Sequence, residues 1–70
     1  MQHFTKNLKT LRLSRKLTQA EAAAALGMTQ QAYQKIESGK SPDIKISTLK
    51  NICNTFNVSA DWLLNPKVRN

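Results

Sequence analysis

The sequence predicts an all-α fold, a compact domain of five short helices. Apolar residues recur at helical spacings of three and four, as in Phe4, Leu8 and Leu11, and no segment has the alternating pattern of a strand. Gly27 and Gly39 each end a helical pattern, where a residue of positive φ closes a helix. Serine or threonine precedes most of the patterns, as expected of N-caps.

The first two helices are predicted at about residues 5–15 and 18–26. The first has its apolar face at Phe4, Leu8 and Leu11 and its lysines off that face. The second starts in a capping box, in which the Thr18 hydroxyl accepts the Glu21 amide and the Glu21 carboxylate accepts the Thr18 amide. The apolar spacing thus predicts the first helix, and the capping box predicts where the second helix starts.

The third helix is predicted at about residues 29–38, capped by Thr29 and separated from the second by a tight, glycine-containing corner. A turn of this length sets two helices at a steep angle, and in DNA-binding proteins the second of them enters the major groove. Helical spacing places Ala32, Tyr33 and Ile36 toward the core. The opposite side then consists of glutamine and lysine side chains, with no acid in its first half.

Two further helices are predicted at about residues 47–56 and 59–65, with Ser47 and Ser59 as their N-caps. Before them lies a loop in which we expect Ile44 and Ile46 to anchor the chain to the core. Pro66 ends the last helix. One domain therefore spans 1–66, followed by a short tail, 67–70.

Charge and size favour a binding module over a catalyst. The 70 residues contain 11 lysines and arginines against four acids, a net charge of +7, so a polyanion is the natural partner, although an anionic membrane surface or solubility alone would also explain the sign. One His and one Cys cannot form a catalytic or metal-binding set, and we expect no enzymatic activity, metal or cofactor. Lone Cys53 fits a reducing, cytoplasmic setting, and no apolar run is long enough to span a membrane.

The run LTQAEAAAALGMTQQAYQKIESGK, Leu17 to Lys40, resembles the helix-turn-helix of the lambdoid phage repressor and Cro family, the XRE-like transcriptional regulators. VSADWLL, Val58 to Leu64, resembles the fifth helix of that family. The resemblance covers nearly the whole chain. It implies a lambda-repressor-like DNA-binding domain, with the helix-turn-helix in helices 2 and 3.

Residue roles follow from the resemblance, position by position. It implies base contacts by the outward side chains of helix 3, namely Gln30, Gln31, Gln34 and Lys35. It implies phosphate or backbone contacts by Gln19, Thr18, Thr29, Lys40 and Lys45. Gln19 would also brace Gln30, and Arg12 and Glu37 would form an internal ion pair. A glutamine amide has both the donor and the acceptor needed to pair with N6 and N7 of adenine, which suits the first set.

The function expected is sequence-specific binding of double-stranded DNA by a Cro-type or repressor-type regulator of phage, prophage or bacterial origin. We expect a homodimer on a roughly palindromic operator, formed before or only on DNA, with an interface near helix 5 that uses Leu63, Leu64 and Val68. Two alternatives stay open: an antitoxin-like or adaptor module whose ligand is another protein, and a controller protein of a restriction-modification system.

Overall fold

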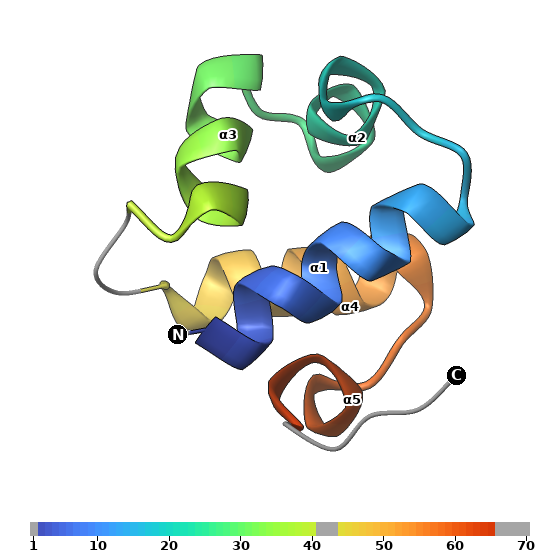
Figure 1. The fold of residues 1–70 in the computed structure, drawn as a ribbon, viewed down its shortest axis with the longest axis vertical. Coiled ribbons are helices and arrows are strands. Elements are labelled where there is room, and N and C mark those ends of the chain that lie inside the picture. The colour runs from blue at the N-terminus through green and yellow to red at the C-terminus, as the bar shows by residue number, and fades with distance from the viewer. Residues whose placement is uncertain (1, 41–43, 66–70) are drawn as a thin grey trace.

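The computed structural model describes residues 2–40 and 44–65, and these residues form five helices and no strand. The helices are α1 (Gln2–Ser14), α2 (Gln19–Leu26), α3 (Gln30–Ser38), α4 (Ile46–Phe56) and α5 (Ala60–Leu64). Helix α1 packs against α3 and α5, and α4 packs against α2 and α5 (Figure 1). The predicted all-α class is confirmed.

Local chemistry fixes the starts of three helices. Thr18 Oγ1 accepts the Glu21 amide at 3.1 Å and Glu21 Oε1 accepts the Thr18 amide at 2.9 Å, which completes the capping box of α2. Thr29 caps α3 by accepting the amide of Ala32, and Ser59 caps α5 in the same way through Trp62. Each hydroxyl satisfies an amide that the helix itself leaves without a partner.

The corner between α2 and α3 is made by Gly27, whose φ of 72° lies in the left-handed region. The Gly27 amide donates to Ala24 O, and the Met28 amide donates to Ala23 O at 3.0 Å, the hydrogen-bond pattern of a Schellman motif. The chain then enters α3 at once. In Figure 1 α2 is seen almost end-on while α3 stands upright in the plane of the view, so the two axes cross steeply.

One predicted helix start and one predicted N-cap are wrong. Helix α1 begins at Gln2, three residues earlier than expected. Helix α4 begins at Ile46 behind an N-cap, Lys45, whose side chain makes no capping bond, so Ser47 lies inside the helix. Ile44 packs against the core as expected, but Ile46 is 72% exposed. A side chain in the first turn points back past the helix end, where no core residue covers it.

The core contains ten buried apolar residues drawn from all five helices, and the partly buried Trp62 packs against it. They are Phe4, Leu8, Leu11, Ala22, Ala23, Leu26, Tyr33, Ile52, Phe56 and Leu63. Because Leu63 is fully buried, the prediction that it exposes a dimer surface is wrong. Leu64 is 40% exposed, whereas Pro66, Val68 and the predicted tail lie outside the described residues.

One buried polar side chain joins α1 to α5. Asn7 lies between Phe4 and Leu11 on the apolar face of α1, and its Nδ2 donates to the carbonyls of Trp62, Leu63 and Asn65 at 3.2, 2.9 and 3.0 Å. These carbonyls lie at and just past the C-terminal end of α5, where the last carbonyls of a helix have no partner in the next turn. Asn7 therefore fastens the short last helix to the first.

Candidate nucleic-acid interface

The outward side of α3 consists of amide and cationic side chains. Gln30, Gln31, Gln34 and Lys35 are all exposed, whereas Tyr33 and Glu37 on the opposite side are buried. Glu37 is the only acid of this helix, so its burial leaves the outward side without negative charge. Ala32, expected in the core, is exposed, because the buried stripe runs through Tyr33, Ile36 and Glu37. This side offers hydrogen-bond donors and acceptors to a polyanion without repelling it.

Two shallow hollows flank this helix, and between them they gather most of the predicted contact residues. One is lined by Gln19, Gln31, Gln34, Lys35, Ser38 and Lys40. The other lies between α3 and the start of α4, and Lys45 lines it beside Thr29, Gln31 and Lys35. Gln30 and Thr18 line neither hollow, but both are exposed, Gln30 in the first turn of α3 and Thr18 at the start of α2.

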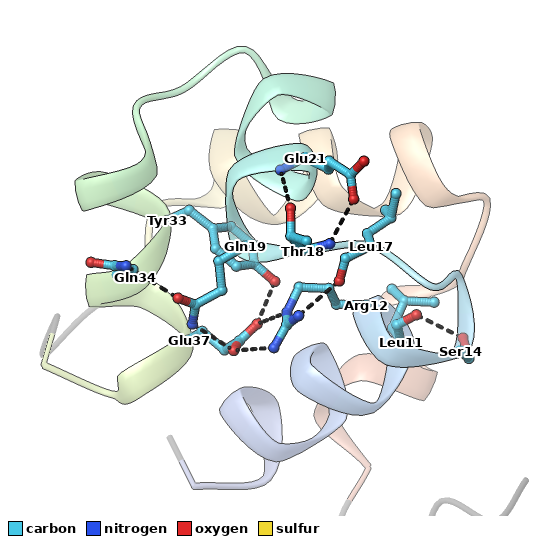
Figure 2. A network of polar contacts seen from close by, with 10 residues as sticks. All are labelled: Leu11, Arg12, Ser14, Leu17, Thr18, Gln19, Glu21, Tyr33, Gln34 and Glu37. Atoms are coloured by element: carbon cyan, nitrogen blue, oxygen red, sulfur yellow. Dashed lines mark hydrogen bonds and ion pairs between the residues drawn. The ribbon is translucent and has the colours of Figure 1, made fainter.

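Below the surface, Glu37 is the centre of a buried polar network (Figure 2). Its Oε2 accepts from Arg12 Nε at 2.8 Å and from the Tyr33 hydroxyl at 2.6 Å. Its Oε1 accepts from an Arg12 terminal nitrogen at 3.1 Å and from Gln19 Nε2 at 3.0 Å. A carboxylate has about four lone-pair sites, so every site of Glu37 is used. The side chains of Arg12 and Glu37 are only 11% and 5% exposed.

The network keeps the pair charged. Burial alone would raise the pKa of the Glu37 carboxyl, but hydrogen bonds from Arg12, Tyr33 and Gln19 outweigh burial and hold that pKa below its ordinary value. The hydrogen bond to Glu37 raises the pKa of the Arg12 guanidinium. Burial, followed by the bond to Glu37, raises the pKa of the Tyr33 hydroxyl, which therefore stays a donor. Within the described residues no buried side-chain nitrogen or oxygen lacks a hydrogen-bond partner.

Gln19 connects this network to the surface. Its Nε2 donates to Glu37, and its Oε1 accepts from Gln34 Nε2 at 3.2 Å. In the described part of the chain Gln19 thus holds Gln34, not Gln30, against the expectation drawn from the resemblance. Gln34 lies one turn after Gln30 and nearer to Glu37, which sets the position of the Gln19 head group.

The described ranges contain no group of three or more His, Cys, Asp and Glu side chains that would hold a metal ion. Among the helices in 2–40 and 44–65, none has the length and apolar character needed to cross a membrane.

Comparison with known proteins identifies the family to which this arrangement of helices belongs. The model of a helix-turn-helix family matches residues 8–63, four-fifths of the chain. The chain belongs to the helix-turn-helix family of the Cro and repressor type. In the terms of that family α2, the corner at Gly27 and α3 are the helix-turn-helix, and α1, α4 and α5 support it.

Two helix-turn-helix relatives come from Bacillus subtilis (strain 168). The chain is 48% identical over 62 residues to the uncharacterized HTH-type transcriptional regulator YqaE, a match that covers 87% of this chain and 52% of the relative. It is 44% identical over 62 residues to the SPbeta prophage-derived uncharacterized HTH-type transcriptional regulator YonR, covering 87% of this chain and 56% of that protein. The chain thus spans about half the length of these relatives.

Two features of this helix-turn-helix domain were missed at the sequence level. Asn7 occupies a position of the apolar stripe of α1, and a polar residue at such a position signals a buried hydrogen-bonding role. Ser38 lines the same hollow as Gln34 and Lys40, but its Oγ donates to Lys35 O. The helical period alone places Ser38 on the outward side, one turn after Gln34.

Proposed function

We propose that this domain binds double-stranded DNA sequence-specifically as part of a transcriptional regulator of the Cro or repressor type, with α3 in the major groove. The observation that carries the proposal is the composition of the outward side of α3: three glutamines and one lysine, while the one acid of the helix is buried. Glutamine pairs with adenine and lysine with guanine in that groove, so Gln30, Gln31, Gln34 and Lys35 are the proposed base contacts.

Phosphate contacts are proposed for the residues around this helix: Gln19, Thr18, Thr29, Lys40 and Lys45. The hydroxyls of Thr18 and Thr29 accept helix amides and keep their own hydrogen for a phosphate oxygen. The start of α2 adds the positive end of a helix dipole beside Gln19. The net charge of +7 favours the same partner.

A dimer on a roughly palindromic operator is proposed on grounds of size. The longest dimension of the domain is 29 Å, less than the spacing of about 34 Å between half-sites one helical turn apart. One copy therefore covers one half-site only. Leu64, the exposed apolar residue of α5, is the proposed centre of the contact between copies.

Selection of bound sites from a randomised duplex pool tests this function. We expect one motif with two related halves, and a gel-shift affinity whose logarithm falls with the logarithm of salt with a slope of about −7 for a dimer touching roughly eight phosphates. Asn54→Ala removes an exposed amide from α4 and serves as the matched control for Gln30→Ala. An enriched motif that Gln30→Ala binds as well as Asn54→Ala does would refute the role of Gln30. Absence of any salt-sensitive shift would favour the protein-interaction alternative.

A further inference from the structure

A chain of hydrogen bonds runs from the buried network to the outward side of α3. Glu37 Oε1 accepts from Gln19 Nε2 at 3.0 Å, and Gln19 Oε1 accepts from Gln34 Nε2 at 3.2 Å. Figure 2 shows the three side chains in line, with the carbonyl oxygen of Gln34 pointing away from Gln19. The chain of bonds links an ionised, buried group to an exposed side chain at the proposed DNA interface.

The buried carboxylate of Glu37 fixes which way the two amide groups point. An ionised carboxylate only accepts hydrogen bonds, so the Gln19 amide must turn its NH₂ toward Glu37 and its oxygen outward. That oxygen in turn requires a donor, so Gln34 must turn its own NH₂ inward. Turning Gln19 over would place its oxygen against the carboxylate oxygens and leave two acceptors facing each other. The exposed end of Gln34 is consequently the acceptor, Oε1.

The other glutamines of α3 are not held in this way. Gln30 and Gln31 are exposed, and their side chains make no hydrogen bond to other residues of the described ranges. Each is able to rotate its amide by half a turn and offer either the donor or the acceptor to a base. Gln34 loses its bond to Gln19 if it does the same.

We propose that Glu37 and Gln19 are positioning residues that present Gln34 Oε1 to the major groove, so that Gln34 selects a base with an amino group there. On the strand that it faces, this base is adenine, through N6, or cytosine, through N4. Guanine O6 and thymine O4 are acceptors and oppose the Gln34 oxygen. The proposal rests on the proposed DNA-binding function and adds a preference that the glutamine side chain alone does not have.

The test compares base preferences, because a merely structural role of Gln19 would change affinity for all sequences equally. Sites are selected with the parent and with Gln34→Met, and the base pair whose preference changes is assigned to Gln34. We expect the parent to favour adenine or cytosine over thymine or guanine on one strand there by about fivefold to tenfold. Replacing that base by its analogue without the amino group should lower the affinity of the parent for the duplex by a similar factor. The affinity of Gln34→Met should not change.

Gln19→Met is the decisive variant, since it keeps the length of the side chain and removes both hydrogen bonds. We expect its preference at the Gln34 base pair to fall below about twofold, while preferences at other base pairs stay as in the parent. Gln31→Met is the matched control and should relax a different base pair. Ratios of affinities between duplexes do not depend on the folded fraction, so a loss of stability in Gln19→Met would not mimic the effect.

Two results would overturn the proposal separately from the function. If Gln19→Met kept the parent's preference at the Gln34 base pair, Gln34 would not depend on Gln19, although sequence-specific binding would stand. The same holds if the parent favoured guanine or thymine on the strand that Gln34 faces. A parent that enriched no motif at all would refute the proposed function and this proposal together.

Discussion

Removal of the Arg12 guanidinium from the buried network is the most sensitive test of what stabilises the fold. Arg12→Met keeps an unbranched apolar stem but removes two donors to Glu37 and one to Leu17 O. The Glu37 carboxylate, on a side chain 5% exposed, then retains only the bonds from Tyr33 and Gln19, and no other cation among the described residues forms an ion pair with it. Breaking such a pair on one side costs about 3–5 kcal/mol. A 70-residue domain has a total stability of roughly 4–10 kcal/mol, so the variant should lose about half of it.

Urea unfolding followed by circular dichroism at pH 7 measures this loss. In thermal unfolding, the same change should lower Tm by at least about 12 °C, at about 4 °C or more per kcal/mol for a domain of this size. The double variant Arg12→Met/Glu37→Met replaces both charges by apolar groups and should recover most of the difference, because burying an ion pair has itself a large desolvation cost. A loss of less than about 1 kcal/mol in the single variant would refute the reasoning.

The pH dependence of stability gives a second, independent test of the Arg12–Glu37 pair. In the parent the pKa of Glu37 is lowered on folding, so its stabilisation is present above the unfolded pKa of about 4.3 and is lost as the pH falls through the folded pKa. In Arg12→Met burial becomes dominant and should raise the pKa of Glu37 above the unfolded value. That variant should therefore gain stability relative to the parent as the pH falls from 7 toward 4. Parallel pH profiles of the two proteins would contradict this account.

Three further substitutions test other parts of the fold. Asn7→Ala should cost about 1–3 kcal/mol and speed hydrogen exchange in α5, because it removes the side-chain donor that three carbonyls at the end of α5 share; unchanged exchange would contradict this role. Tyr33→Phe removes the hydroxyl that donates to Glu37, so it should cost about 1.5–3 kcal/mol of stability and raise the pKa of Glu37. Carboxyl NMR titration measures this pKa, and an unchanged value would exclude the Tyr33 hydrogen bond as a cause of its lowering. Gly27→Ala should cost about 1–2 kcal/mol in urea unfolding through the left-handed φ alone, since nothing lies within 4 Å of an added Cβ; a neutral result would show that the corner adapts.

The parts of the fold that the sequence predicts well are those that local chemistry decides. Thr18, Thr29 and Ser59 are N-caps as expected, and Gly27 and Gly39 are left-handed helix ends, because each motif is complete within about six residues. The N-cap predicted for α4, Ser47, was wrong for the opposite reason. Its cap, Lys45, makes no side-chain bond, so the start is set by how the following apolar residues pack and not by a capping signal.

The exposed side chains on the outward side of α3 were predictable from the sequence, but the hydrogen bonds between them and their neighbours were not. Helical spacing alone places three glutamines and a lysine on one side of α3. The bond from Gln34 to Gln19 depends on how α2 crosses α3, and the bond from Gln19 to Glu37 depends on the acid being buried. Neither follows from spacing along the chain. The same is true of Asn7, whose partners lie more than fifty residues away.

The proposed function requires that the side-chain amides on the outward side of α3 contact DNA bases. Titration of the labelled domain with its selected duplex, followed through the glutamine and asparagine side-chain NH₂ signals, tests this claim directly. We predict large shifts for Gln30, Gln31 and Gln34, and no shift for Asn54 on α4. Saturation with the duplex that moved the Asn54 signal and left the three α3 glutamines unchanged would contradict the claim.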